Sequence, residues 1–280
     1  MQNIEQTVIN VMLEHGLTPP DRIFIDGGLH RFKDESGKPN NYYVAHADGR
    51  AAGVVGSWKT GLKVNWKADG DYPKLTDQQR IDFKIEQHRQ QLIRKAEAKT
   101  RHDAAMTKAS YIWARTTPPN NHPYLIKKRV KPHNAGEYKG FLVIPVFNSH
   151  KLVSVQLIDK DGGKRFLSGS QLKGSYSQLG SQKDNNPIMI VEGWATGASI
   201  YETTNYLTYV AFSAGKLKEV AQYVRSFNLT APIVICGDND LSGVGQAAAI
   251  DAALAVGGKY IIPPIVGADW NDVINMEVMP

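Results

Sequence analysis

The chain has 280 residues, of which 42% are hydrophobic and 21% charged, a globular composition that excludes wholesale disorder and collagen-like or coiled-coil architecture. No apolar run approaches the roughly 20 residues needed to cross a bilayer, and the first residues carry no secretory signal, so we expect a cytoplasmic protein without a membrane partner. Residues 1–135 carry 22 Lys and Arg against 14 Asp and Glu, whereas residues 136–280 carry 11 against 13. This asymmetry suggests one part that holds a polyanion and another whose carboxylates take part in chemistry.

The first 74 residues are expected to form a short helix and a small antiparallel β module. Apolar residues at helical spacing predict the helix over residues 1–16. The expected strands cover residues 23–26, 29–33, 42–46, 52–57 and 62–66, with turns at Gly27-Gly28, Asp48-Gly49 and Thr60-Gly61. Aromatic and basic residues are interleaved in this module, as on a surface that binds single-stranded nucleic acid. The simpler interpretation places Trp58 and Trp66 in its core.

Residues 75–117 are expected to connect this module to the rest of the chain. Residues 75–116 contain no glycine or proline, which predicts a long helix, either continuous or broken once. Its apolar stripe is thin and consists of Ile81, Ile85, Leu92 and Ala96, while basic residues cover much of the remaining surface. A solvated connector is the first expectation, although a rod with so many bases would also suit a phosphate backbone.

The rest of the chain predicts two further parts, with α+β and α/β character. In residues 118–186, a basic run at 127–131 is followed by expected antiparallel strands at 140–147, 152–158 and 164–167. In residues 187–280, strands expected at 188–191, 209–211, 233–236 and 260–262 alternate with helices expected at 195–203, 217–226 and 243–256. Such alternation predicts a mostly parallel sheet with right-handed crossovers.

Carboxylates follow three of these four strands. Glu192 comes directly after the strand at 188–191, Asp238 and Asp240 follow the strand at 233–236, and Asp269 and Asp272 follow the last strand. Ligands bind beyond the carboxyl ends of strands in open α/β sheets, so these side chains are expected at one edge. Oxygen ligands without His or Cys suit Mg²⁺ or Mn²⁺, and a divalent ion supports phosphoryl and nucleotidyl transfer. The only cysteine, Cys236, excludes a cysteine-based zinc ribbon in this chain.

Two short segments resemble nucleotide-binding motifs. Residues 243–248 fit the G-x-G-x-x-A pattern of a dinucleotide-binding turn, but Asp238 and Asp240 just before it would repel a pyrophosphate. Gly215-Lys216 is not a phosphate-binding P-loop, because Leu217 stands where that motif needs Ser or Thr. The carboxylate site is therefore favoured over an NAD site.

The same residues carry a resemblance to a known family. Glu192-Gly193 after a hydrophobic strand, and Asp238 and Asp240 after a later one, resemble the TOPRIM domain of topoisomerases, DnaG-type primases and some nucleases. Upstream, the turn at 159–163, Lys164-Arg165-Phe166-Leu167 and the block ending in Gly180 resemble the segment that precedes this domain in bacterial primases. The N-terminal module, with His30-Arg31-Phe32 and Trp58-Lys-Thr-Gly61, resembles that of plasmid-transfer and satellite-phage primases.

The resemblance implies roles for individual residues. Glu192 corresponds to a general acid/base or metal-site glutamate, and Asp238 and Asp240 to Mg²⁺ ligands. Asp269, with Asn271 or Asp272, corresponds to a further acidic pair, and the spacing leaves open which of these side chains faces the ion. A basic set is expected to bind the nucleotide or template, although Lys216 is equally explained as a solvated lysine: Lys164, Arg165, Lys216, Lys127, Lys128 and Arg129.

The sequence therefore predicts a DNA primase that makes short primers from NTPs on single-stranded DNA with Mg²⁺ or Mn²⁺, in plasmid or phage-type replication. Bacterial primases carry a zinc ribbon, which this chain cannot form. Two expectations follow: either the β module replaces the ribbon in reading the template, or this chain starts primers without sequence specificity. Unwinding is expected to come from a helicase on another chain or from a part of the protein outside this sequence. A TOPRIM-type nuclease and a non-catalytic module that binds single-stranded nucleic acid are the alternatives, and a topoisomerase is disfavoured because it needs a tyrosine nucleophile domain.

Overall fold

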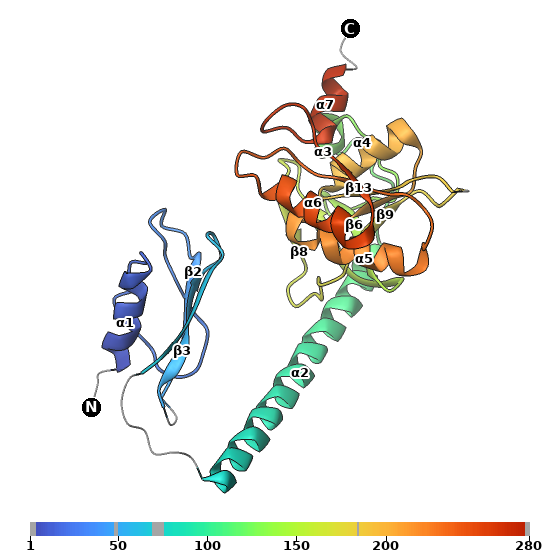
Figure 1. Cartoon of the computed structure of the whole chain (residues 1–280). Coiled ribbons are helices and arrows are strands. Elements are labelled where there is room, and N and C mark those ends of the chain that lie inside the picture. The colour runs from blue at the N-terminus through green and yellow to red at the C-terminus, as the bar shows by residue number, and fades with distance from the viewer. Residues whose placement is uncertain (1–3, 48–49, 69–75, 184, 278–280) are drawn as a thin grey trace. The chain divides into compact units, whose positions relative to one another are not determined.

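The computed structural model describes residues 4–47, 50–68, 76–183 and 185–277 (Figure 1). The chain divides into two compact units, Met1–Gln87 and His88–Pro280. The boundary falls inside one long helix, α2 (Asp77–Trp113). The finer division at residues 74, 117 and 186 stays a prediction. Among the described residues, no helix is both long and apolar enough to span a membrane.

The first unit is a four-stranded antiparallel sheet with one helix against it. It consists of α1 (Ile4–Glu14), β1 (His30–Phe32), β2 (Asn41–His46), β3 (Ala52–Ser57) and β4 (Leu62–Lys67), paired in the order β1-β2-β3-β4. Val8 and Met12 of α1 pack with Tyr43, Val55 and Trp66 of the sheet in one core. This unit therefore has its own hydrophobic core.

One expected strand of this unit is not formed. Residues 23–26 are irregular, although Ile23 is buried in the core. The Phe24 N–H donates to the Tyr43 hydroxyl at 2.8 Å. This backbone N–H therefore bonds to a side chain, whereas in a strand it would bond to the carbonyl of a neighbouring strand. The prediction of a strand here was wrong for this reason. The expected turn at Asp48-Gly49 lies outside the described residues.

Helix α2 is continuous over 37 residues. Its predicted apolar stripe is not packed, because Ile81, Ile85 and Leu92 are all exposed. Among the side chains of α2 that the structure describes, Ala109 and Ile112 in the last turns pack in a core with Val143 and Val155. Tertiary packing thus fixes the C-terminal end of the helix in the second unit.

The second unit begins with an antiparallel part. A short helix, α3 (Pro123–Lys128), precedes β5 (Gly136–Tyr138), β6 (Phe141–Asn148), β7 (Lys151–Ile158) and β8 (Lys164–Phe166), which pair in the order β5-β6-β7-β8. In the turn before β8, the Asp159 carboxylate accepts the N–H groups of Asp161 and Gly163 at 3.0 and 2.7 Å. This turn sets the position at which Lys164 enters the sheet.

The predicted mostly parallel sheet is confirmed. Five strands pair in the order β13-β12-β10-β11-β9, in which only β9 is antiparallel to its neighbour. They are β9 (Ser177–Leu179), β10 (Ile188–Val191), β11 (Thr208–Val210), β12 (Ile233–Cys236) and β13 (Lys259–Ile261). The helices are α4 (Trp194–Thr204), the short 3-10 helix η1 (Ala214–Lys216), α5 (Leu217–Phe227), α6 (Val244–Val256) and α7 (Trp270–Glu277).

Helices cover both faces of this sheet. Ile188 and Ile190 of β10 pack in a core with residues of α5 and α6, whereas Met189 and Val191 belong to a second core with residues of α4. All four residues of β10 are buried, as expected for a central parallel strand whose sequence is continuously apolar. The polar residues that follow such a strand are therefore the first that can reach solvent at this edge.

Candidate active site

The site begins where two neighbouring parallel strands end. Strands β10 and β12 pair so that Val191 lies opposite Cys236, which brings Glu192 and Asp238 out at the same edge of the sheet. Together with Asp269, just before α7, they line a cavity of about 240 Å³. Sequence reasoning placed these three carboxylates at one edge, and the structure brings them together there.

The opposite wall of this cavity, hereafter the acidic cavity, comes from the antiparallel part of the unit. Lys164 from the start of β8, Gln156 from β7 and Lys128 from the end of α3 line it, with the ring of Tyr124 beneath Lys164. The Lys164 Nζ lies 5.6 Å from the centre of the Tyr124 ring. Two cationic side chains thus share a cavity with three carboxylates.

Asp238 is the most perturbed carboxylate in the cavity. Burial, together with repulsion from Glu192, Asp269 and Asp240, raises the pKa of Asp238 to about 7, although Lys164 opposes this shift. Its Oδ1 is buried and has no hydrogen-bond partner among the described residues. Burial also raises the pKa of Glu192, against a backbone hydrogen bond from Ala214 that lowers it. A cation bound beside these two acids would lower their pKa values again, because it favours the ionised carboxylates.

The two lysines respond in opposite directions. Burial and repulsion from Lys128 lower the pKa of Lys164, and the cavity carboxylates only partly offset this. Burial alone would lower the pKa of Lys128 as well, but Asp269 and Asp272 outweigh it and the pKa is raised. Lys128 is thus a firmly charged lysine held by acids, and Lys164 is the lysine with the weaker hold on its proton.

Asp240 is placed differently from the other predicted metal ligands. Its carboxylate accepts hydrogen bonds from the Val244 and Gly245 N–H groups at 3.2 and 2.8 Å and from the Ser242 hydroxyl at 2.7 Å. These bonds, the Ser242 one above all, lower the pKa of Asp240. Asp240 does not line the acidic cavity. It caps the start of α6, and it is close enough to Asp238 to raise the pKa of that acid.

The same geometry argues against a dinucleotide site at residues 243–248. A pyrophosphate would need the free N–H groups at the start of the helix, and the Asp240 carboxylate already occupies them. A Cβ at Gly245 would lie 2.7 Å from the Asp238 carbonyl oxygen and 2.9 Å from Asp240 Oδ2. This glycine is therefore explained by the close approach of α6 to the acidic loop.

Asp269 and Asp272 cap α7 reciprocally. The Asp269 N–H donates to Asp272 Oδ2 at 3.2 Å, and the Asp272 N–H donates to Asp269 Oδ1 at 2.9 Å. Asn271 is only 1% exposed and donates to the Ser199 hydroxyl and the Lys128 carbonyl. Of the three residues left open by the sequence, Asp269 alone lines the acidic cavity.

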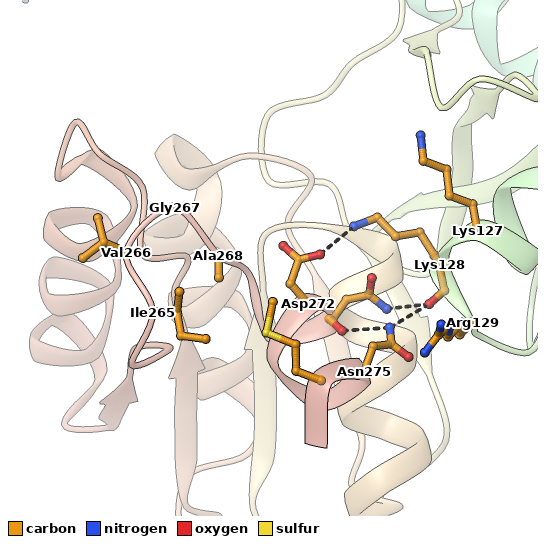
Figure 2. A pocket seen from close by; sticks show the side chains of 11 residues that line it. Lys127, Lys128, Arg129, Ile265, Val266, Gly267, Ala268, Asp272 and Asn275 are labelled. Atoms are coloured by element: carbon orange, nitrogen blue, oxygen red, sulfur yellow. Dashed lines mark hydrogen bonds and ion pairs between the residues drawn. The ribbon is translucent and has the colours of Figure 1, made fainter. Parts of the chain in front are cut away.

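A second cavity of about 500 Å³, the basic cavity, adjoins the first at Lys128. Lys127, Lys128 and Arg129 form one wall, and Ile265 and Val266 contribute apolar surface. Figure 2 shows the Lys128 side chain reaching Asp272, while its carbonyl oxygen accepts bonds from side-chain amides of α7 and the Lys127 side chain extends away. The predicted basic run therefore faces a cavity next to the carboxylates.

Two predicted binding residues lie outside both cavities. The Arg165 guanidinium sits 4.6 Å from the centre of the Phe141 ring, and the Lys216 Nζ lies 5.4 Å from that of Phe166. Burial lowers the pKa of Lys216. Neither residue lines the acidic or the basic cavity of the described part of the chain. Their roles toward nucleotide or template stay predictions.

Sequence reasoning missed several residues that line the acidic cavity, among them Tyr124, Gln156 and Phe212. Gln156 carried a usable signal, because it is a polar residue inside the apolar run of β7 and is 5% exposed. Tyr124 and Phe212 carried none. They reach the cavity from α3 and from the loop after β11, through folding that no local pattern reports.

The donor chemistry of the acidic cavity fits a divalent cation. It offers the carboxylates of Glu192, Asp238 and Asp269, and Oδ1 of Asp238 is buried without a hydrogen-bond partner. The pKa values of Glu192 and Asp238 are raised. Among the described residues, no three His, Cys, Asp or Glu side chains come close enough together to hold a metal alone. Mg²⁺ is commonly held by one or two carboxylates together with water and the phosphates of a substrate.

Comparison with known proteins defines the class. Residues 187–278 match the Toprim domain family model, so the part of the chain that carries the carboxylates is a Toprim domain. The chain is 31% identical over 261 residues to DNA primase TraC of Escherichia coli, covering 85% of this chain and 24% of that protein. A second Escherichia coli protein of the same name is 31% identical over 268 residues, which are 89% of this chain and 18% of that protein. The predicted resemblance to Toprim-domain DNA primases is confirmed, and the chain spans less than a quarter of these relatives.

Solved primase structures are also similar. The match to the structure of the DnaG catalytic core covers 64% of this chain and 76% of that chain, with 12% sequence identity and a TM-score of 0.44. The match to the primase fragment of the bacteriophage T7 primase-helicase protein covers 89% of this chain and 98% of that chain, with 14% sequence identity and a TM-score of 0.40.

Proposed function

We propose that the protein is a DNA primase, which joins NTPs into a short primer on a single-stranded DNA template with Mg²⁺ or Mn²⁺. One observation carries the proposal: Glu192 and Asp238 of a Toprim domain share the acidic cavity with Lys164 and Lys128. A nucleotidyl transfer site must bring together carboxylates for a cation and lysines for phosphates. The identity to DNA primase TraC supports the same conclusion.

In this proposal, the charged residues of the acidic cavity have different roles. Asp238, together with Glu192 or Asp269, would hold Mg²⁺ or Mn²⁺, which when bound screens phosphate charge and lowers the pKa of an attacking hydroxyl. Glu192, with its raised pKa, is suited to accept the proton of a primer hydroxyl. Lys164, which follows the Asp159 turn and lines the cavity, would contact the phosphates of an incoming nucleotide.

The basic cavity is proposed to hold the adjoining part of the nucleotide or template. Its wall of Lys127, Lys128 and Arg129 suits phosphates, and the apolar side chains of Ile265 and Val266 offer surface to a base. We also propose that a helicase on another chain unwinds the DNA. The proposed context is plasmid or phage-type replication in the cytoplasm.

The test is a synthesis assay. The protein is incubated with single-stranded DNA, labelled NTPs and Mg²⁺ or Mn²⁺, and products are separated by length. Asp238→Asn should reduce synthesis at least about a hundredfold, since it removes charge from the site where the cation would bind. Asp251→Asn is the matched control, because Asp251 lies on α6 and pairs with Lys218 outside the cavity.

Three outcomes separate the candidate functions. Short products that depend on Asp238 support the primase. Degradation of the template would assign the site to a nuclease, and DNA binding without either reaction would leave a non-catalytic binding protein. Synthesis by Asp238→Asn at the wild-type rate would contradict the assignment of the site.

A further inference from the structure

The sheet of the first unit has one face that α1 does not cover. Strand residues alternate between faces, and Tyr43, Ala45 and Val55 point into the core with α1. The registers place a different set on the opposite face, hereafter the outer face: Arg31, Tyr42, Val44, Val54, Lys63, Asn65 and Lys67. Every one of these residues is exposed or half-buried.

Three residues of the outer face form an aromatic and cationic stack. The Trp58 ring, directly after β3, stacks on the Tyr42 ring with 4.4 Å between centres and 26° between planes. The Arg31 guanidinium lies 4.4 Å from the centre of the Trp58 ring. Trp58 remains 47% exposed, whereas Trp66 is 5% exposed in the core. The prediction that both tryptophans are core residues was right for Trp66 and wrong for Trp58.

The backbone makes room for this stack. Gly56 lies opposite Tyr42 in the register, and a Cβ there would come 2.5 Å from the Tyr42 Cζ. The tyrosine ring therefore lies down over β3 beside Trp58 instead of standing away from the sheet. The glycine provides a flat aromatic surface at this edge of the outer face.

The charge of the outer face is of one sign. Lys63 and Lys67 of β4 point to it, and the described strand positions on this face include no Asp or Glu. The adjacent Lys59 is 3.8 Å from Asp34, which lies in the turn after β1 and is tied to Ser36 and Asn40. A surface that combines stacked aromatic rings with lysines is complementary to unpaired bases and a phosphate backbone.

We propose that the outer face binds single-stranded DNA. Bases stack on the Arg31–Trp58–Tyr42 group, since guanidinium planes and aromatic rings both stack with bases, and Lys63 and Lys67 contact phosphates. A duplex keeps its bases paired and stacked on one another, so it presents no free base to this surface. The site is separate from the Toprim carboxylates and does not depend on nucleotidyl transfer.

The test measures binding by the full chain without metal or NTP. Fluorescence anisotropy of a labelled oligo-dT should show Trp58→Ala weakening binding about 5- to 150-fold, the range expected for loss of one stacked base. Trp58→Phe should restore most of the affinity, because it keeps a stacking ring. Tyr260→Ala, which removes a 48% exposed aromatic residue of β13, should leave affinity unchanged.

Salt dependence and a second ligand complete the test. Lys63→Ala should lower the slope of log Kd against log salt by about 1, as expected for one lost phosphate contact. The assay contains neither metal nor NTP, so a failed primase assay and a failed binding site give different results. Asp251→Asn, which lies outside the acidic cavity, should bind oligo-dT like the wild type. Wild-type affinity in Trp58→Ala, or equal losses with duplex DNA, would overturn the proposal.

Discussion

The Nζ of Lys128 lies 3.4 Å from Oδ1 of Asp272, a residue 144 positions further along the chain. The same Nζ is 3.7 Å from Asp269, and two amides of α7, those of Asn271 and Asn275, donate to the Lys128 carbonyl. The end of α3 is thereby fixed to the start of α7. This contact holds the antiparallel part against the Toprim domain and forms the boundary between the acidic and basic cavities.

Lys128→Ala is therefore expected to act on the site more than on the fold. The ion pairs are partly exposed, so their loss should cost about 1 kcal/mol of unfolding free energy or less. Loss of the cation beside Asp269 should slow NTP incorporation about ten- to a hundredfold. Thermal unfolding and the KM for NTP measure the two effects. Lys139→Ala is the control, because Lys139 lies between β5 and β6 and lines neither cavity. Equal losses in both variants would contradict a specific role for Lys128.

The raised pKa of Asp238 predicts how stability changes with pH in the metal-free protein. Since the pKa is about 7 in the folded chain and 3.8 in the unfolded one, this group stabilises the fold most below pH 4. That contribution is lost as pH rises from about 4 to about 7. Asp238→Asn should flatten this part of the profile and raise stability at pH 8 by about 1–3 kcal/mol, allowing for solvent exposure.

Chemical denaturation between pH 4 and 8 checks this prediction. Mg²⁺ should recover part of the stability of the wild type at pH 8 and have no effect on Asp238→Asn. Parallel pH profiles for the two proteins would show that the acid is not perturbed.

Asp240 calls for two substitutions, because it caps α6 and was also predicted to bind metal. Asp240→Ala removes the acceptor of the Val244 and Gly245 N–H groups and should destabilise the protein by about 1 kcal/mol. Asp240→Asn can still cap the helix, so its melting temperature should stay close to that of the wild type. If Asp240→Asn nevertheless abolishes synthesis, the residue acts on the cation; if it retains synthesis, its role is to position the loop of Asp238.

The sequence predicted well where the carboxylates gather on the sheet, because the signals for this edge are local. A continuously apolar run such as 188–191 can only be a buried strand or a buried helix segment, and a carboxylate directly after it must lie at the end of that element. Glu192 and Asp238 were found in this way. Which side chain of an Asp-x-Asp pair faces the cavity is decided by hydrogen bonds to α6, and the spacing alone does not contain that information.

The parts that were missed depend on distant contacts. Residues 23–26 have the alternation of a strand, but the Tyr43 hydroxyl takes a backbone amide there. Trp58 and Trp66 are each followed by a lysine, and their local sequence does not show which of them is buried. Trp66 lies within β4 and packs in the core, whereas Trp58 comes directly after β3 and is exposed. Tyr124 reaches the acidic cavity from a helix far upstream in the sequence, so no pattern near the carboxylates predicts its place there.

The last prediction concerns Lys164 and Arg165, which are adjacent in β8 and point to opposite faces of the strand. Lys164 lines the acidic cavity with Glu192 and Asp238, while the Arg165 guanidinium rests on the Phe141 ring. A charge-assisted phosphate contact is worth about 1.5–3 kcal/mol, so Lys164→Ala should slow NTP incorporation by roughly ten- to a hundredfold. Arg165→Ala should leave that step within about threefold and act, if at all, on template affinity.

The comparison is made at saturating template with NTP varied, and then at saturating NTP with template varied. Lys164→Arg keeps the charge and should recover part of the rate, which a purely structural role would not require. Unfolding curves for all three variants exclude loss of fold as the cause. Equal effects of Lys164→Ala and Arg165→Ala on NTP use would mean that the cavity lysine does not contact the nucleotide. Degradation of DNA that is unchanged in Lys164→Ala would favour the nuclease, because a hydrolytic site needs only the scissile phosphate and a water molecule.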